Sequence, residues 1–267
     1  MFRTHALFVS FVIPLVLLPP ASARSSAAPD VHDIIQRSVA ANQANFKAAP
    51  QFNHKERDQT SSGTKTYQIT MIDGSPYQRL IEVNGKALSP SQDAEERKKQ
   101  DQVRSARHSQ SGADRRKRIA RYQRDRARDN QMMNQLTIAF NFTLLGEHTV
   151  RGFNVWVLRA TPRPGYQPPN METQVLPGMQ GELWIDQQTY QWVKVTARVI
   201  HPVSIEGFLA QVEPGTQFEL ENAPVGGGVW QPSHFAMRSQ AKVLFLINRA
   251  SQADETYFDY QPAARKQ

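Results

Sequence analysis

The chain of 267 residues contains no cysteine. This absence excludes structural disulfides, cysteine-ligated zinc, thiol nucleophiles and a cysteine-linked lipid anchor. Long apolar runs are also scarce, because only residues 6–18 approach one, and that run is too short to span a bilayer. With 39% hydrophobic residues and a mean hydropathy of −0.56, the sequence predicts a soluble protein of one or two domains with a sizeable core.

Residues typical of catalysis or metal binding do not cluster in the sequence. No HExxH motif, close histidine pair or complete phosphate-binding loop is present. We therefore predict no catalytic residue, no metal and no cofactor, although a fold can assemble a site from distant positions. Outside residues 1–23, the scattered histidines are His32, His54, His108, His148, His201 and His234.

The N-terminus has the pattern of a secretory signal peptide over residues 1–23. Arg3 supplies the basic start, residues 6–18 are apolar, and residues 21–23 (ASA) form a cleavage signal. An uncleaved anchor is the alternative, but thirteen residues fall short of the ~20 that a membrane span needs. We expect cleavage and export to the periplasm without a lipid anchor, leaving one domain over residues 24–267.

A net charge of +8 raises the question of nucleic-acid binding. The charge is local, because residues 93–129 contain thirteen Lys and Arg against seven Asp and Glu. Binding to single-stranded nucleic acid uses aromatic side chains for stacking, and Tyr122 is the only one in this stretch. Because the chain is expected to be exported and its basic stretch has only one aromatic residue for stacking, we do not expect nucleic acid as a partner.

The charged stretch predicts a basic helical insert at about residues 89–136. Pro90 suits a first helical turn, and helix formers lie on both sides of a break at residues 111–112. Three interpretations of the insert are open. It is a solvated helical pair, or it is partly disordered, or it forms a contact with anionic lipid or an acidic partner. A membrane contact would gain about 1 kcal/mol per basic residue. The candidate contact residues are Arg115, Arg116, Lys117, Arg118, Arg121 and Arg124.

The rest of the chain predicts one helix followed by many strands. Residues 30–45 have an amphipathic helical period, and Asp-Gly and Asn-Gly pairs divide residues 50–84 into three antiparallel strands. From Thr137 onward, short alternating runs bring the total to ten to twelve strands without βαβ alternation. The predicted fold class is mainly β (α+β), a single curved antiparallel sheet forming a half-open β-barrel with an N-terminal helix and the charged helical insert.

Large apolar side chains on the strands are numerous for a sheet with so few helices to cover it. They form either an ordinary core or the lining of an apolar groove on a curved sheet. A register error of one residue would move any such set to the other face. Alternation alone selects these groove candidates: Ile138, Phe140, Phe142, Val193, Val195, Phe235, Met237, Phe245 and Ile247.

Three short motifs point to a family. They are GELWID at residues 181–186, YQWVKV at 190–195 and GVWQP at 228–232. Together with the export signal, N-terminal helix, hairpins and helical excursion, they resemble the LolA/LolB-type outer-membrane lipoprotein-sorting proteins over about residues 30–260. The resemblance implies an incomplete barrel with helices as a lid, whose concave apolar surface holds the acyl chains of a lipoprotein or another amphiphile. The long basic insert departs from the compact carriers of that family.

We therefore expect a periplasmic, monomeric, non-enzymatic carrier or sensor with a lipid or lipoprotein cargo. Its other expected partners are a protein of the inner or outer membrane, or an anionic lipid surface. The alternative is a ligand-free interaction module of the cell envelope, which uses its sheet for packing and its basic insert for a partner. An enzyme is the remaining class, and no motif supports it.

Overall fold

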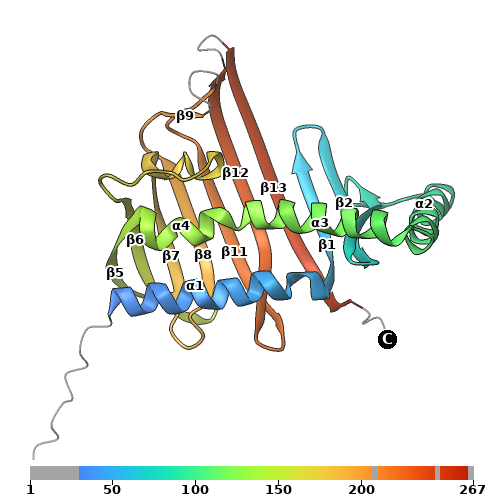
Figure 1. Cartoon of the computed structure of the whole chain (residues 1–267), viewed down its shortest axis with the longest axis horizontal. Coiled ribbons are helices and arrows are strands. Elements are labelled where there is room, and N and C mark those ends of the chain that lie inside the picture. The colour runs from blue at the N-terminus through green and yellow to red at the C-terminus, as the bar shows by residue number, and fades with distance from the viewer. Residues whose placement is uncertain (1–29, 206–209, 244–246, 264–267) are drawn as a thin grey trace, which may run out of the picture.

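The computed structural model describes residues 30–205, 210–243 and 247–263 (Figure 1). The predicted signal peptide lies outside these residues. The helical elements are α1 (Val31–Ala48), η1 (Ala49–Gln51), α2 (Pro90–His108), α3 (Gly112–Asp129), α4 (Gln131–Ala139), η2 (Met171–Thr173) and η3 (Leu176–Gly178). The strands are β1 (Phe52–Thr60), β2 (Gly63–Ile72), β3 (Ser75–Val83), β4 (Lys86–Ala87), β5 (Phe140–Val150), β6 (Phe153–Pro162), β7 (Met179–Asp186), β8 (Trp192–Val199), β9 (Val203–Ile205), β10 (Ala210–Val212), β11 (Gln217–Gly226), β12 (Val229–Val243) and β13 (Ile247–Pro262).

All strands belong to one antiparallel sheet. Its order is β4-β3-β2-β1-β13-β12-β11-β8-β7-β6-β5, and β10 joins the side of β12 with β9 beside it. Within the described residues β4 and β5 end this order without pairing with each other, so the sheet is curved but open. The predicted fold class is confirmed. In the part of the chain that the structure describes, the sheet has 13 strands rather than ten to twelve, because β4 and β9 have only two and three residues, too few to form an alternating run.

The hairpins of β1 to β4 follow the turn residues. Asp73 and Gly74 have φ of 48° and 90°, and Asn84 and Gly85 have φ of 51° and 71°. Two consecutive positive φ angles are the geometry of a type I′ turn, which matches the twist of the strands that it joins. The three strands predicted over residues 50–84 are therefore confirmed.

Helices α1, α2 and α3 begin at capping residues. The Asp30 side chain accepts from the amide of His32, and Ser89 and Gln92 form a reciprocal capping box at the start of α2. Ser111 caps α3 by accepting from the amide of Asp114, so the predicted break in the insert is confirmed. The chain breaks again at Asn130, between α3 and α4.

The predicted start of the next strand at Thr137 is wrong. Residues 136–139 continue α4, the amide of Phe140 donates to the carbonyl of Leu136, and β5 begins at Phe140. Apolar residues two apart also occur on helices, so a short run does not distinguish the two structures. Burial of Ala139 in the core supports the helical turn here.

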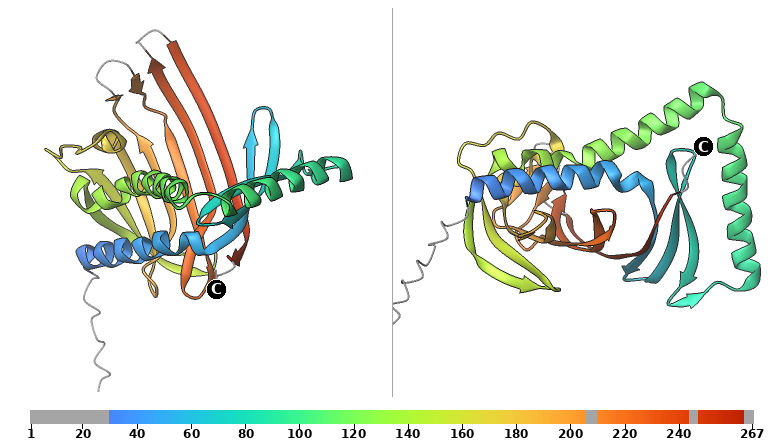
Figure 2. Two further views of the ribbon diagram at one scale, coloured as in Figure 1. Left: turned by 45° about the vertical axis from the view of Figure 1, so that its right-hand side comes forward. Right: turned by 90° about the horizontal axis from the view of Figure 1, so that it is seen from below.

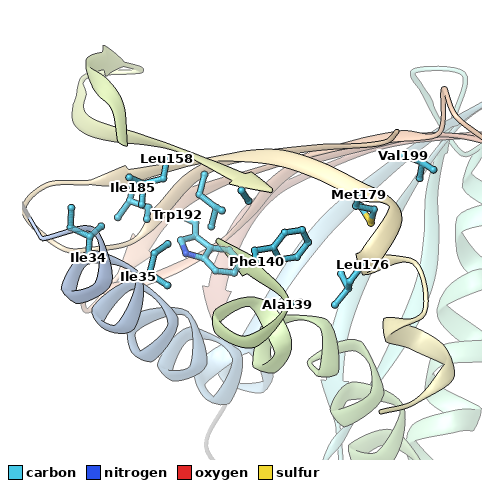
Figure 3. Close-up of a cluster of buried hydrophobic side chains, with 12 residues drawn as sticks. Ile34, Ile35, Ala139, Phe140, Leu158, Leu176, Met179, Ile185, Trp192 and Val199 are labelled. Carbon is cyan, nitrogen blue, oxygen red and sulfur yellow. The ribbon is translucent and has the colours of Figure 1, made fainter. Parts of the chain in front are cut away.

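The helices cover the concave face of the sheet. Figure 2 shows α1 and α4 across this face, α3 continuing toward the β1 to β4 hairpins, and α2 beyond them. The main core lies between α1, α4 and strands β5 to β8 (Figure 3). Its buried members are Ile34, Ile35, Ala139, Phe140, Leu158, Ala160, Leu176, Met179, Leu183, Ile185, Trp192 and Val199.

A buried polar residue attaches the end of α1 to the sheet. The Asn45 Nδ2 donates to Gln191 Oε1 at 2.5 Å, and Asn45 Oδ1 accepts from the Trp230 amide at 3.1 Å. The Gln231 side chain donates to the Asn45 carbonyl at 3.2 Å. A buried amide that satisfies both its donor and its acceptor holds α1 at one position on the sheet.

Among the described helices, none is long and apolar enough to cross a membrane.

Candidate functional site

Where α1 and α4 cover it, the concave face is filled with protein side chains. Phe140 is 5% exposed and lies in one cluster with Leu183, Ile185 and Trp192. Figure 3 shows Ile35 from α1 and Trp192 from the sheet on either side of this packed layer. This half of the concave face is therefore a close-packed core.

A pocket lies at the other end of the concave face. Figure 1 shows α3 crossing the sheet at this end. Its volume is about 560 Å³. We call it the concave pocket. It is lined by Ala49, Phe52, His54, Glu56, Ile69, Met71, Pro76, Gln78, Tyr122, Gln231, Pro232, Tyr257 and Tyr260.

Strand register explains why these residues meet. Glu56 pairs with Tyr67 on one side and with Tyr257 on the other, and His54 pairs with Ile69. Directly paired residues point to the same face of a sheet, and residues two apart on one strand share it. The alternation Phe52, His54, Glu56 therefore projects into the pocket. Tyr122 reaches it from α3.

Aromatic rings form one wall of the concave pocket. His54 stacks on Tyr260 with centroids 5.0 Å apart, and Phe52 meets the same ring edge-on at 6.4 Å. His54 also lies 6.0 Å from Tyr257. The Tyr260 hydroxyl donates to the Pro232 carbonyl at 2.7 Å, which fixes that ring. The wall is preorganised by contacts among its own members.

The ionisable groups of the pocket have shifted pKa values. Burial raises the pKa of Glu56 to about 7, and the neighbouring carboxylates of Asp58 and Glu255 add to the shift. Burial lowers the pKa of His54 to about 4. The Tyr257 hydroxyl donates to a carboxylate oxygen of Glu255, and burial followed by this bond raises the pKa of Tyr257. At neutral pH the imidazole of His54 is therefore uncharged, and Glu56 is close to half protonated.

The position of α3 over the pocket is set by two arginines on its inner side. Arg126 donates to the carbonyl of Phe46 in α1 and lies over the Phe46 ring at 4.2 Å. Arg118 donates to Ser75 Oγ at 2.6 Å, at the start of β3, and to the Asp73 carbonyl at 3.1 Å, in the turn between β2 and β3. These contacts attach α3 to the body on both sides of Tyr122.

Five of the predicted groove residues lie on the concave face, but outside the concave pocket. Phe140 is in the main core, and Phe142 and Val195 pack against that core. Phe235 and Met237 are half-buried and share the face of Val195 through the β8–β11–β12 register. Their contact with a ligand stays a prediction.

The other four predicted groove residues lie elsewhere. Ile138 is on α4 and 51% exposed. Val193 is the extra residue of a β-bulge, because Lys194 pairs with Trp184 while Trp192 pairs with the next residue, Ile185. Such a bulge interrupts the alternation, and Val193 packs in a second cluster on the opposite face. Phe245 lies outside the described residues, and Ile247 begins β13 with a side chain outside them.

The predicted basic contact residues divide into two groups. Arg118 faces the body, as described above, and is half-buried. The other five are exposed on α3 and form no ion pair within the described residues. These five, Arg115, Arg116, Lys117, Arg121 and Arg124, are called the basic face of α3.

A second hollow, of about 570 Å³, crosses the opposite face of the sheet. Glu182, Thr196 and Glu219 pair across β7, β8 and β11 and alternate with core residues such as Leu183, which places them on this outer face. The lining also includes Arg159, Gln180, Arg198, Gln217, Arg238 and Gln252. Its polar walls do not suit an apolar ligand. Among the described residues no group of three His, Asp or Glu side chains is placed to hold a metal ion.

No protein-family model matches the sequence, and no match was found among curated proteins. Similar solved structures include a LolA superfamily protein from Nitrosomonas europaea, with 12% identity over 90% of this chain and 96% of that chain at a TM-score of 0.32. An outer membrane lipoprotein-sorting protein domain from Vibrio parahaemolyticus is 11% identical over 85% of this chain and 93% of that chain, with a TM-score of 0.31. A chain of the MucA/MucB complex from Pseudomonas aeruginosa is 12% identical over 87% of this chain and 100% of that chain, with a TM-score of 0.25.

At these identities and TM-scores the likeness is one of general arrangement, and we take no residue role from it.

None of the residues that line the concave pocket was predicted from the sequence as a site residue. The alternation of Phe52, His54 and Glu56 with charged Lys55 and Arg57 was a usable signal in a run that otherwise looks uniformly polar.

Proposed function

We propose that the chain is a non-enzymatic periplasmic binding protein, a carrier or sensor that holds the apolar part of an amphiphile in the concave pocket. The observation that supports this proposal most directly is the pocket itself, which lies between the sheet and α3. Its volume of about 560 Å³ falls in the range of roughly 300–1,000 Å³ that is usual for small-molecule sites. Acyl chains of a lipid or lipoprotein are the cargo that we favour.

The lining supports an apolar guest with a polar end. Ile69, Met71 and Pro76 supply aliphatic surface, and the aromatic wall supplies more. Each buried methylene contributes ~0.8 kcal/mol, so eight of them contribute about 6 kcal/mol before the cost of association is subtracted. A pocket of this kind can retain its ligand without a covalent bond or a cofactor.

A second candidate function is favoured by the basic face of α3. Five exposed basic side chains without ion pairs among the described residues attract an anionic membrane surface or an acidic partner. On this interpretation the chain is an envelope interaction module that needs no ligand. The two functions are compatible, because Arg116, Lys117, Arg121 and Arg124 of the basic face lie about 100° or more around α3 from Tyr122, at 3.6 residues per turn.

Native mass spectrometry of protein purified from the cell envelope, followed by lipid extraction, tests the first proposal. We expect a stoichiometric bound amphiphile. Gln78 is an exposed residue of β3 that lines the pocket, so Gln78→Trp places a large ring in the pocket with little effect on folding. The matched control is Gln59→Trp, an exposed position of β1 outside the lining.

The expected result is loss of the bound mass in Gln78→Trp and its retention in Gln59→Trp. A ligand-free mass for the wild type and both variants would contradict the carrier proposal and leave the interaction module as the function to pursue. Equal retention in both variants would place the ligand outside the concave pocket.

A further inference from the structure

We propose that the concave pocket recognises an organic cation, an alkylammonium head group whose alkyl chain occupies the apolar part of the same pocket. This inference rests on the proposed function and names the class of its ligand. The chemistry is shared by a zwitterionic lipid head group and a free cationic amphiphile.

The aromatic lining is the first argument. Phe52, His54, Tyr257 and Tyr260 come from neighbouring strands, and Tyr122 comes from α3. An aromatic ring presents a negative face, and a cation within about 6 Å of its centroid is attracted to that face. Several rings around one space are the arrangement that binds quaternary ammonium groups. A purely aliphatic lining would hold a chain equally well, so the rings add selectivity for the head.

The charge of the lining is the second argument. Among the described residues no Lys or Arg lines the pocket, while Glu56 does. Asp58 and Glu255 act on Glu56 electrostatically and add negative potential to this region. An anionic head group would therefore be repelled, whereas an ammonium group gains from the rings and the carboxylate together.

Proton linkage supplies a signature of this binding mode. The pKa of Glu56 is raised to about 7, so near pH 6 the carboxyl is mostly protonated in the empty pocket. An ammonium group placed beside it favours the carboxylate, so binding near pH 6 releases a proton. The other ionisable groups around Glu56 are His54 and Asp58 of β1, Lys65 and Tyr67 of β2, Glu255, Tyr257 and Tyr260 of β13, and Tyr122 and Arg126 of α3.

Titration calorimetry with three probes of equal chain length tests the proposal: decyltrimethylammonium, decyl sulfate and decyl maltoside, each below its micelle concentration. We expect decyltrimethylammonium to bind at least about tenfold more tightly than the other two. Near pH 6, its binding enthalpy should depend on the ionisation enthalpy of the buffer, because a proton is released. Choline without a chain separates the contribution of the head from that of the chain.

Two pairs of variants locate the effect. Glu56→Gln should abolish the proton release and reduce the preference for the ammonium probe, whereas Glu82→Gln, on β3 outside the lining, should change neither. Tyr122→Leu should reduce the preference and Tyr122→Phe should retain it, because the ring face and not the hydroxyl is required. Retained binding of decyl maltoside in each variant shows that the pocket is still folded.

The possible outcomes distinguish a failure of this inference from a failure of the proposed function. Equal affinity for the three probes would overturn the cation proposal and leave amphiphile binding intact. An ammonium preference that survives both Glu56→Gln and Tyr122→Leu would overturn it as well, because the site would lie elsewhere. Binding of none of the probes would contradict the proposed function itself. Vesicles containing choline lipids then distinguish the lipid head group from a free amphiphile as the source of the cation.

Discussion

At the scale of single residues, the pocket combines two groups whose pKa values move in opposite directions for one cause. Burial disfavours the charged form of each side chain, so the pKa of Glu56 rises to about 7 and that of His54 falls to about 4. Both lie on β1, two residues apart, and face the same pocket. The pair therefore remains largely uncharged between pH 5 and 6.

The stability of the protein should reflect this opposition. Glu56 binds a proton more tightly in the folded state, so its contribution to stability is present below about pH 4.5 and is lost as the pH rises to about 7. His54 binds a proton less tightly when folded, so its contribution grows from about pH 4 to 6.5. In the wild type the two trends offset each other between about pH 4.5 and 6.5.

Glu56→Gln removes one of these trends. We expect its melting temperature to rise relative to that of the wild type as the pH increases from about 4.5 to 6.5, as measured by thermal unfolding at a series of pH values. Glu82→Gln should follow the wild-type profile. Parallel profiles for Glu56→Gln and the wild type would show that Glu56 does not titrate with a raised pKa.

Arg118 and Arg116 differ although they are two residues apart on α3. Arg118→Ala leaves Ser75 Oγ and the Asp73 carbonyl without this donor, so we expect a loss of about 1–3 kcal/mol in the free energy of unfolding. Arg116→Ala, at an exposed position, should change it by less than about 0.5 kcal/mol. Urea denaturation measures both values. Equal losses would mean that the inner contacts of α3 contribute nothing specific.

At the scale of elements, α3 has two distinct sides. Its inner side, with Arg118, Tyr122 and Arg126, contacts the body. Its outer side carries four residues of the basic face, which are Arg116, Lys117, Arg121 and Arg124. In proteins most of the stability of a helix comes from tertiary packing, so the inner contacts are needed to hold α3 in place. Helix α3 is thus attached on its inner side and exposes basic side chains on its outer side.

The basic face predicts binding to anionic vesicles. We expect the double variant Arg116→Glu and Arg121→Glu to reduce binding to vesicles containing anionic lipid at low salt by more than tenfold, since each basic residue near the surface contributes about 1 kcal/mol. High salt should remove the difference by screening. Vesicle flotation measures this. Lys86→Glu, an exposed change on β4, serves as the charge control and should retain most of the binding.

At the scale of the whole molecule, the concave face has a packed half and a half that contains a pocket. The packed half joins α1 and α4 to β5 through β8, and Asn45 ties α1 to the adjoining strands. This arrangement anchors the sheet without closing it. The pocket then lies where α3, a more weakly attached element, completes the lining.

The packed half should dominate stability. Leu183 is 3% exposed in the main core, so Leu183→Ala should cost about 2–5 kcal/mol in the free energy of unfolding. Leu145 is 41% exposed on the edge strand β5, and Leu145→Ala should cost less than about 1 kcal/mol. Chemical denaturation of the two variants provides the comparison. Similar losses in the free energy of unfolding for the two variants would contradict the division of the concave face into a packed half and a half that contains a pocket.

Much of the architecture followed from short-range patterns. The Asp-Gly and Asn-Gly turns, the Ser89 capping box and the break at Ser111 act within a few residues, so the sequence by itself determined the hairpins and the helical insert. Alternation also placed Phe142 and Val195 on one face correctly. It failed at Val193, because a bulge inserts one residue without changing the composition of the strand.

Only the tertiary structure decided where the concave face is filled and where it is hollow. That outcome depends on which strands α1, α3 and α4 cross, and these elements pack against strands far away in the sequence. Tyr122 from the basic insert and Tyr260 near the C-terminus meet at one pocket because of that crossing. The sequence therefore determined an open antiparallel sheet with a charged helical insert, and long-range packing decided that its pocket is aromatic and acidic and lies beneath that insert.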